Sequence, residues 1–369
     1  MAEMGKAAVY LGMGHPFEIQ EFPIPDPEPG AILIKITMAT ICGSDLHMWR
    51  GDIDLGAMGA PLPAILGHEM TGKVAKLGKG VTADSAGQPL AEGDRVVYRY
   101  FIPCGHCPAC LRGDDAACFS NLMYIAPCEP FPHFLGAYAE YYYARPGQTV
   151  IKVPDDLTDE MVAPANCALS EVIYGLEKVA LGLGETIVIQ GAGGLGINAT
   201  AVAKEMGANK VIIIDGIHDR LELAKSFGAD EIIDMNEFKT PEERTAKVLE
   251  LTGYLGADVV AELVGIPAAV PEGLGMLGAG GRYLEVGNVS PGKMMEIDPA
   301  GALVMGSKTI YGVVTYKANT LKKAMDFLSR TKGKYPFDKI LAKSYPLEQI
   351  NEAFEAQDKG LVSRSAIVP

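Results

Sequence analysis

A glycine-rich turn between a predicted strand and a predicted helix is the feature that most constrains how this chain of 369 residues can fold. Residues 186–190 are a short apolar run, residues 191–196 read Gly-Ala-Gly-Gly-Leu-Gly, and residues 197–206 are typical of a helix with small side chains. A second apolar run, residues 211–214, ends at Asp215. This order of strand, Gly-x-Gly-x-x-Gly turn, helix and acidic strand end is typical of a parallel sheet that binds a dinucleotide.

The chemistry of this turn indicates which dinucleotide it binds. Glycines let the backbone turn tightly and approach a pyrophosphate, whose negative charge lies at the amino end of the following helix. Asp215 is expected to bind the adenosine ribose hydroxyls and to repel a 2′-phosphate, so the sequence favours NAD over NADP. The expected contacts in the turn are Gly191, Gly193, Gly194, Leu195 and Gly196.

The second half of the chain has the texture of an α/β fold. Apolar runs alternate there with helical segments, and further strands are expected at residues 231–233, 258–264, 281–286 and 309–314. We therefore predict a doubly wound, mostly parallel sheet of six strands with helices on both faces. This domain is expected to span residues 161–315.

The rest of the chain is expected to form one β-rich domain from residues 1–160 and 316–369. Short apolar runs separated by glycines and prolines predict a small barrel or sandwich. The tail is expected to rejoin this domain. The expected strands are residues 6–10, 32–38, 65–80, 95–98 and 365–368, and the expected tail helices are residues 321–328 and 347–357.

Composition excludes several classes of function. The net charge of −14 argues against nucleic acid or an anionic membrane as the main partner. No apolar run approaches the roughly 18 residues that span a bilayer. Residues 1–6 do not resemble the start of a secretory signal. Seven cysteines, four of them clustered, indicate metal ligands in a reducing compartment, so we expect a cytoplasmic protein.

The four clustered cysteines carry the sharpest local signal. Cys104, Cys107, Cys110 and Cys118 have the spacing C-x₂-C-x₂-C-x₇-C. Four thiolates this close in sequence can surround one tetrahedral zinc ion and stabilise a loop that has little core of its own. An iron–sulfur cluster is the alternative, and the sequence favours zinc because it contains no second cluster motif.

A second set of candidate ligands has a different character. Cys42, His68 and Cys167 supply two thiolates and one imidazole, without a fourth protein ligand. Zinc sites with three protein ligands and one open position are typically catalytic. Asp45 and Glu69 lie close in sequence to these ligands and can accept a hydrogen bond from the ligating imidazole.

Taken together, these motifs resemble those of the zinc-dependent medium-chain alcohol dehydrogenases. The resemblance covers nearly the whole chain and rests on residues 42–47, residues 67–69, the four-cysteine segment, Cys167 and the 191–215 segment. It implies a GroES-like catalytic domain that carries a structural-zinc lobe at residues 104–118. It also implies that a Rossmann domain interrupts this catalytic domain, with the active site in the cleft between them.

The resemblance implies a role for each candidate residue and two zinc ions per chain, one catalytic and one structural. Ser44 and His47 resemble the relay that carries the substrate proton to solvent. Asp45 resembles the carboxylate that holds the ligating histidine, and Glu69 resembles the acid behind the metal. The implied reaction is hydride transfer between NAD and an alcohol whose oxygen zinc polarises. Further cofactor contacts are implied for Arg220, Val286 and Arg364.

Two features depart from the pattern or leave alternatives open. Gly43 follows Cys42 where some family members carry a pyrophosphate-binding arginine, so Arg364 or backbone amides would carry more of that binding. Glu171 lies one helical turn after Cys167. It can face the nicotinamide or the zinc, or simply belong to the first turn of a helix.

The substrate is the least determined part of the prediction. We expect an apolar or cyclic secondary alcohol, or a primary one; a polyol or amino-alcohol dehydrogenase would share every motif. A non-catalytic protein that binds zinc and a dinucleotide would be expected to lose Ser44, His47 or Cys167, and all three are present. A short 119–134 segment favours a homotetramer over a dimer. The expected pocket residues are Met48, Trp49, Ile53, Tyr100, Glu171 and the Met123–Tyr124 region.

Overall fold

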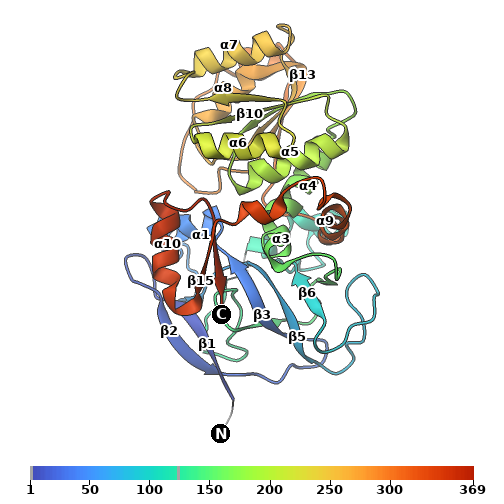
Figure 1. The fold of residues 1–369 in the computed structure, drawn as a ribbon, viewed down its shortest axis with the longest axis vertical. Coiled ribbons are helices and arrows are strands. Elements are labelled where there is room, and N and C mark those ends of the chain that lie inside the picture. Colours follow the sequence, from blue (N-terminus) through green and yellow to red (C-terminus); the bar gives the residue numbers. More distant parts are fainter. Residues whose placement is uncertain (1–2, 123–124) are drawn as a thin grey trace. The chain divides into compact units, whose positions relative to one another are not determined.

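The computed structural model describes residues 3–122 and 125–369, and the chain divides into two compact units (Figure 1). The first unit comprises Met1–Ser170 with Lys317–Pro369, and the second comprises Glu171–Tyr316. Residues 161–170, which the sequence analysis assigned to the nucleotide-binding domain, therefore belong to the first unit. Packing gives the reason, because Ala163 lies in a buried cluster with Met38 and Ala366 of that unit.

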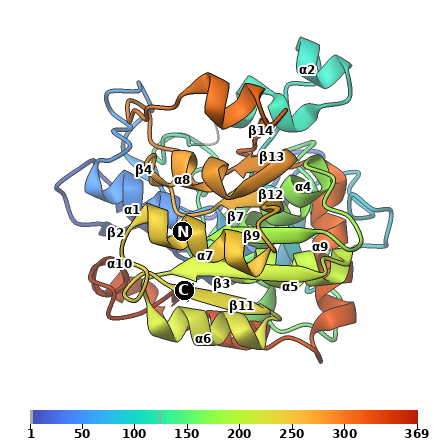
Figure 2. The same cartoon turned by 90° about the horizontal axis from the view of Figure 1, so that it is seen from above.

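The second unit is built on a six-stranded parallel sheet in the order β11-β10-β9-β12-β13-β14. Figure 2 shows these strands side by side, from β14 at one edge to β11 at the other. The strand order reverses between β9 and β12, and ligands of doubly wound sheets bind outside the carboxyl ends of the strands at such a point. The predicted doubly wound sheet is confirmed. The strands are β9 (Thr186–Gln190), β10 (Lys210–Asp215), β11 (Glu231–Asp234), β12 (Ala257–Glu262), β13 (Leu277–Glu285) and β14 (Thr309–Gly312).

Helices cover both faces of this sheet, which explains why its central strands are apolar on both sides. In Figure 1, α5 and α6 lie on one face, and α7 and α8 lie on the other. A buried cluster that includes Val188, Ile212 and Val260 packs against Leu274 of α8. The helices are α4 (Ser170–Lys178), α5 (Gly194–Met206), α6 (His218–Ser226), α7 (Pro241–Leu251) and α8 (Ala269–Met276).

The described residues of the first unit form two sheets. The larger has seven strands in the order β15-β16-β3-β5-β6-β8, with β7 also paired to β3, and the smaller has the order β2-β1-β4. The strands of the larger sheet are β3 (Ile32–Thr40), β5 (Glu69–Leu77), β6 (Arg95–Tyr98), β7 (Tyr141–Ala144), β8 (Val150–Lys152), β15 (Lys343–Pro346) and β16 (Ser365–Val368). The strands of the smaller sheet are β1 (Met4–Tyr10), β2 (Glu18–Pro23) and β4 (Ala64–Ile65).

Pairing between distant strands determines which side chains meet in this unit. β16 pairs antiparallel with β3, so that Ala366 lies opposite Thr40, and β3 pairs with β5, so that Thr40 lies opposite Glu69. The C-terminal strand therefore lies next to the two segments that carry the first metal-ligand motifs. The helices are α1 (Gly43–Arg50), α2 (Pro108–Leu111), α3 (Asp159–Val162), α9 (Ala318–Thr331) and α10 (Ile350–Asp358). Within the described ranges, no helix is both long and apolar enough to cross a membrane.

The first testable consequence concerns Gly136, whose backbone lies against the segment that leads to His68. A Cβ atom added there would lie 2.0 Å from Ile65 O and 2.7 Å from Leu66 O. These are backbone atoms, so relief requires the strand itself to move. We expect Gly136→Ala to reduce the free energy of unfolding by about 1–3 kcal/mol, the usual range for overpacking. Thermal or urea unfolding of the purified variant measures this.

Gly333 provides the matched control. It is exposed, has an ordinary φ, and a Cβ added there would meet no heavy atom within 4 Å. Gly333→Ala is therefore expected to change stability by less than about 0.5 kcal/mol. Equal effects of the two substitutions would contradict the close approach at Gly136.

Candidate functional site

Four thiols gather in the loop that follows β6. The turn Asp115–Ala117 precedes the last of them, and Cys107 Sγ lies 3.5 Å from Cys110 Sγ. Zinc–sulfur bonds of about 2.3 Å in a tetrahedral site separate the sulfurs by about 3.8 Å, so this spacing fits one zinc ion. The four cysteines whose sulfur atoms lie within 4.8 Å of one another are Cys104, Cys107, Cys110 and Cys118.

Backbone amides around these sulfurs favour their ionised form. Cys104 N donates to Cys118 Sγ at 3.3 Å, and Cys107 N donates to Cys104 Sγ at 3.3 Å. Burial acts to raise the pKa of Cys118, but hydrogen bonds from the amides of Cys104 and Ser120 and from the thiols of Cys104 and Cys110 together outweigh it and lower that pKa to about 6. Burial raises the pKa of Cys110 to about 12. A bound cation would ionise all four, because a thiol that coordinates a metal loses its proton.

A partly buried ion pair connects this loop to the larger sheet. Arg99 follows β6 and is fully buried, and its Nη1 donates to Asp115 Oδ2 at 2.7 Å. The carbonyl oxygen of Arg99 accepts a hydrogen bond from Gln148 Nε2 at 2.9 Å. The ion pair of Arg99 with Asp115 therefore holds the four-cysteine loop next to β6, since the loop has little apolar core of its own.

A second group of donors comes together from three separate segments of the first unit. Cys42 directly precedes α1, His68 lies between β4 and β5, and Cys167 lies in the π-helical turn Ala165–Leu169. The ligand atoms of these residues and a carboxylate oxygen of Glu69 lie within 4.8 Å of one another. Cys42 Sγ and Cys167 Sγ are 3.9 Å apart, which suits two thiolates on one tetrahedral ion.

Neighbouring groups favour the protonation states in which these side chains can bind a metal. A hydrogen bond from Cys167 lowers the pKa of Cys42 well below its ordinary value, and His68 adds to this effect, although burial opposes it. His68 Nδ1 lies 3.3 Å from Asp45 Oδ1, and both side chains are buried. A carboxylate in this place fixes the imidazole tautomer and leaves Nε2 for a metal. The geometry therefore fits the role expected for Asp45.

Glu69 is fully buried beside the same donors and is held from two sides. Its Oε2 accepts hydrogen bonds from Thr40 Oγ1 and from Arg364 Nη2, while Oε1 has no hydrogen-bond partner among the described residues. Burial raises the pKa of Glu69 to about 7, although Arg364 opposes the shift. Arg364, expected at the pyrophosphate, is placed by the structure against this carboxylate. Its role in cofactor binding stays a prediction.

Three side chains near the ligands link their segments to one another. Tyr98 Oη and Asn166 Nδ2 both donate to the backbone oxygen of His68, at 3.0 Å and 2.8 Å. Asn166 precedes Cys167 and thereby ties two ligand segments together. Tyr100 has its ring centre 4.6 Å from that of His68, and its hydroxyl donates to Cys167 Sγ at 3.7 Å. The sequence analysis placed Tyr100 in the substrate pocket but did not single out Tyr98 or Asn166.

The neighbouring candidates for the substrate pocket lie on or just after α1. Met48 is 3% exposed, and its backbone oxygen accepts a hydrogen bond from Tyr10 Oη at 2.9 Å. The ring centres of Trp49 and of Phe354 in α10 lie 5.9 Å apart. Ile53 is half-buried. The side chain of Met48 is thus part of the packing of the first unit, and its role toward a substrate stays a prediction.

The residues expected to relay a proton lie on α1. Ser44 and His47 are three residues apart, which places them on the same face of the helix. His47 Nδ1 lies 2.8 Å from Asp52 Oδ2 in a partly exposed ion pair. A carboxylate orients an imidazole in this way and determines which nitrogen carries the proton. Asp52 was not singled out from the sequence, although a carboxylate five residues after the histidine was visible there.

The predicted nucleotide-binding turn joins β9 to α5 in the second unit. Gly191 has a φ of +101°, and a Cβ on Gly196 would lie 1.8 Å from Gly191 O, so the turn requires glycine at both positions. A Cβ on Gly193 would meet no heavy atom within 4 Å, which leaves open space at the amino end of α5. Asp215 closes the turn, because its Oδ2 accepts a hydrogen bond from Ala192 N at 2.7 Å. This cradle fits a dinucleotide pyrophosphate.

Several other candidates also lie in the second unit. Arg220 is half-buried in the first turn of α6, five residues after Asp215. Val286 is buried directly after β13, and its amide donates to Glu262 O at 3.3 Å. Glu171 is mostly buried in the first turn of α4. Met123 and Tyr124 lie outside the described residues.

Two carboxyl groups that were not among the predicted site residues meet at the carboxyl ends of β12 and β13. Glu262 pairs in register with Glu285, and Asn288 Nδ2 donates to both, at 3.2 Å and 3.1 Å. Glu262 Oε1 also accepts hydrogen bonds from the amides of Val264 and Gly265. Burial, followed by the charge of Glu285, raises the pKa of Glu262 to about 7.

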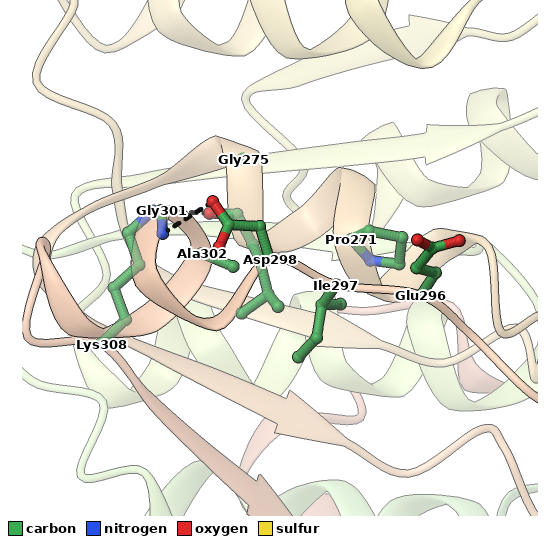
Figure 3. Close-up of a pocket in the computed structure, with 9 residues that line it drawn as sticks. Pro271, Gly275, Glu296, Ile297, Asp298, Gly301, Ala302 and Lys308 are labelled. Carbon is green, nitrogen blue, oxygen red and sulfur yellow. Dashed lines mark hydrogen bonds between the residues drawn. The ribbon is translucent and has the colours of Figure 1, made fainter.

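A cavity of about 340 Å³ lies elsewhere in the second unit, between α8 and residues 296–308 (Figure 3). Lys308 borders it, and its ammonium donates to Leu274 O at 2.7 Å. Asp298 Oδ2 accepts a hydrogen bond from Gly301 N at 3.1 Å, so this carboxylate caps its own turn. None of the predicted site residues lines this cavity.

Comparison with known proteins places these sites in context. Residues 28–155 match a family model described as the alcohol dehydrogenase GroES-like domain, and residues 194–330 match a model described as zinc-binding dehydrogenase. The 5-exo-hydroxycamphor dehydrogenase of Pseudomonas putida is 34% identical over 366 residues, which cover 99% of each chain. The L-threonine 3-dehydrogenase of Pyrococcus horikoshii is 32% identical over 366 residues, which cover 98% of this chain and 97% of that protein.

Solved structures agree with these relatives. The crystal structure of an alcohol dehydrogenase from Thermotoga maritima superimposes with a TM-score of 0.92 at 30% identity and covers all of both chains. The predicted combination of a GroES-like domain with an inserted Rossmann domain is therefore confirmed.

The carboxyl pair of Glu262 and Glu285 leads to a prediction about pH. The native pKa of Glu262, about 7, lies above its ordinary value of 4.5, so between these pH values the folded state holds a proton that the unfolded state has lost. Stability is therefore expected to fall as pH rises through this window, by at most about 3 kcal/mol. Glu262→Gln keeps the neutral form and should flatten this dependence, which denaturant unfolding at pH 5 and pH 8 measures.

Glu242→Gln serves as the control, because Glu242 is an exposed glutamate of the same unit. It should follow the wild-type pH dependence. A wild-type protein that gains stability between pH 5 and pH 8 relative to Glu262→Gln would contradict the assignment of a protonated Glu262.

Proposed function

Because the chain belongs to the zinc-dependent medium-chain alcohol dehydrogenase family, we propose that it transfers a hydride between an alcohol and NAD at a zinc ion held by Cys42, His68 and Cys167. As a member of this family the chain is an oxidoreductase. The observation that carries the proposal is the convergence of these three donors, with ligand atoms within 4.8 Å of one another. Two thiolates and one imidazole form a catalytic zinc site that leaves one position for the substrate.

We propose a second, structural zinc at the four cysteines of the loop after β6. Four thiolates complete a tetrahedral shell, and the site then has no open position for chemistry. The amides that donate to these sulfurs support this role, because they lower the cost of gathering negative charge in a short loop. The two sites together correspond to two zinc ions per chain.

The groups that would be bound supply the chemistry that side chains lack: zinc is a Lewis acid toward the substrate oxygen, and NAD accepts a hydride. The side chains hold and move the proton. Ser44 takes it from the substrate side and passes it to His47, whose ring Asp52 orients at 2.8 Å. Partial exposure of His47 lets the proton leave to solvent. During this proton transfer, the buried side chains that contact His68 and Glu69 hold the metal-ligand side chains in place.

We propose NAD rather than NADP as the cofactor. Asp215 ends β10 beside the glycine turn, and its carboxylate would lie where a 2′-phosphate must be accommodated in NADP. The same carboxylate can instead accept the two ribose hydroxyls of NAD. Arg220 lies five residues later and is proposed to contact the adenosine ribose, with Val286 contacting the nicotinamide end.

For the substrate we propose an apolar or cyclic secondary alcohol. The aromatic ring of Tyr100 lies against His68, which offers an apolar surface at the proposed zinc. The 5-exo-hydroxycamphor dehydrogenase, which is 34% identical to this chain, is named after a bicyclic secondary alcohol. The second candidate is an amino alcohol or polyol, which the 32% identity to an L-threonine 3-dehydrogenase supports.

We also propose that the chain assembles with copies of itself, as a homotetramer or a dimer. β14 is the edge strand of the six-stranded sheet, and Val304, Met305 and Ile310 expose apolar side chains near it. Light scattering of the purified protein tests the assembly, and a monomeric mass would contradict it.

A reducing, cytoplasmic location is proposed as well, because all seven cysteines are free thiols.

The proposed reaction predicts the outcome of an absorbance assay for NADH with linear, cyclic, aromatic and polyol alcohols. We expect the highest rates with cyclic or apolar secondary alcohols, and a chelator should abolish them. Cys42→Ser and His68→Ala should each reduce kcat/KM by more than about 100-fold, because a ligand matters more than its supporting partners. His47→Gln should slow turnover mainly at lower pH, where water removes the proton less readily.

Cys128→Ser is the matched control, since Cys128 is a buried thiol outside both clusters. It should retain the wild-type rate and two zinc ions per chain by metal analysis. Full activity of Cys42→Ser would end the proposed zinc chemistry. Tight NAD binding with two zinc ions but no turnover of any alcohol would favour the non-catalytic alternative.

Cofactor preference provides a separate prediction. Asp215→Asn removes the negative charge but keeps one acceptor, so the ratio of kcat/KM for NADP to that for NAD should rise tenfold or more, which corresponds to about 1.4 kcal/mol. Asp219→Asn, an exposed position in the first turn of α6, should leave the ratio unchanged. A wild-type protein that uses both cofactors equally would contradict the role proposed for Asp215.

A further inference from the structure

Tyr138 places a hydroxyl group next to the proposed catalytic metal site without being a ligand. The side chain is fully buried, and its Oη donates to Asp45 Oδ2 at 2.8 Å. The same Oδ2 accepts a hydrogen bond from Cys42 N at 2.9 Å. The other oxygen of Asp45 lies 3.3 Å from His68 Nδ1. One carboxylate oxygen is thus held by two donors while the other faces the imidazole.

Packing fixes the ring of Tyr138 against the segment that carries His68. Gly67 precedes the histidine with a φ of +85°, and a Cβ there would lie 2.9 Å from the Tyr138 ring. The amide of Tyr138 donates to Leu66 O at 3.1 Å, and that of Ala137 donates to Gly67 O at 2.9 Å. The ring and the backbone of residue 138 therefore contact the 66–68 segment directly, and the hydroxyl contacts the carboxylate that faces His68.

Two further aromatic rings pack against the ring of Tyr138. Phe17 and Phe354 lie edge-on to it, with ring centres at 6.2 Å and 5.6 Å. The ring of Tyr138 is thus held in place, and its hydroxyl has Asp45 Oδ2 at 2.8 Å and the more distant Thr40 O at 3.5 Å as acceptors. Because the site is buried, water is not at hand to replace that hydroxyl as a donor to Asp45.

We propose that Tyr138 is a positioning residue that, through Asp45, holds His68 in the orientation and tautomer that bind the catalytic zinc. This inference rests on the proposed function, since it takes Cys42, His68 and Cys167 as the zinc ligands. Groups that orient a ligating histidine typically change metal affinity by 10–100-fold when they are removed. Loss of the Tyr138 hydroxyl leaves Asp45 Oδ2 with one donor fewer in a buried place, so the carboxylate is free to turn away from His68.

The test compares zinc release from the wild-type holoenzyme and from Tyr138→Phe. Both proteins are mixed with a chromophoric zinc chelator, and release is followed in time. The substitution keeps the ring and removes only the hydroxyl, so the fold is expected to persist. One of the two zinc ions should leave 10–100-fold faster from the variant, and the other, held by the four cysteines, should leave at the wild-type rate and serve as an internal reference. Activity lost with the fast zinc should return on addition of zinc.

Tyr143→Phe is the matched control, because Tyr143 is a buried tyrosine of the same unit whose hydroxyl accepts a hydrogen bond from Glu28 N and whose ring lies in a separate cluster with Ala31 and Leu33. It should release both zinc ions at the wild-type rates. In an Asp45→Ala background, Tyr138→Phe should add no further acceleration, because the proposed route runs through that carboxylate. Additive effects in the double variant would overturn this route.

Two further outcomes would overturn the proposal. Unchanged release of both zinc ions from Tyr138→Phe would show that the hydroxyl does not support the site. Equal acceleration of both ions, with a lowered melting temperature, would show that the residue acts only on overall stability. Failure of the proposed function is recognised separately in the wild-type protein. A protein without the three-ligand zinc site would release a single zinc ion, and a non-catalytic protein would release two zinc ions but form no NADH with any alcohol.

Discussion

The first unit depends on the burial of ionisable groups around His68. Asp45, Glu69 and His68 are all at most 2% exposed, so none of them can rely on water for solvation. A charge buried without a partner costs several kcal/mol, and this cost selects structures in which each such group has a donor or a counter-charge. Glu69 obtains both from Thr40 and Arg364. The C-terminal segment is therefore needed in the first unit for electrostatic reasons as well as for strand pairing.

The same reasoning explains how three ligand segments far apart in sequence can hold a common geometry. Asp45 anchors the start of α1 through Cys42 N, and its second oxygen faces His68. Asn166 returns from the Cys167 turn to the backbone of His68. A buried hydrogen bond therefore connects the Cys167 turn to His68, and the Asp45 carboxylate lies between the Cys42 backbone and the His68 ring. Such a network keeps thiols and imidazole together before a metal binds, which reduces the rearrangement that binding requires.

The second unit follows a different constraint, the close approach of backbone segments at the carboxyl ends of parallel strands. A Cβ on Gly196 would lie 1.8 Å from Gly191 O, and a Cβ on Gly191 would lie 2.6 Å from the side chain of Val264, so neither glycine tolerates a side chain. This approach frees the amino end of α5 and brings Asp215 onto the amide of Ala192. The sheet order also places Glu262 beside Glu285, a pairing that no local pattern required. The glycine turn proposed to hold the cofactor and the carboxyl pair therefore lie at the same edge of the sheet.

Local spacing was sufficient to predict the parts that local physics controls. The glycine turn with its flanking strands, the four-cysteine loop and the Cys42–His47 segment each act over a few residues, where side-chain type and period determine the structure. Contacts between distant segments were not accessible in this way. Tyr138 belonged to an aromatic run that suits barrel packing, Arg364 suggested a phosphate contact, and Asp52 was one acidic residue among many. The sequence by itself determined which candidate ligands and which glycine turn the chain contains. Only the tertiary structure decided which buried partners lie beside them, because partner choice depends on strand pairing between distant segments, such as Ala366 with Thr40.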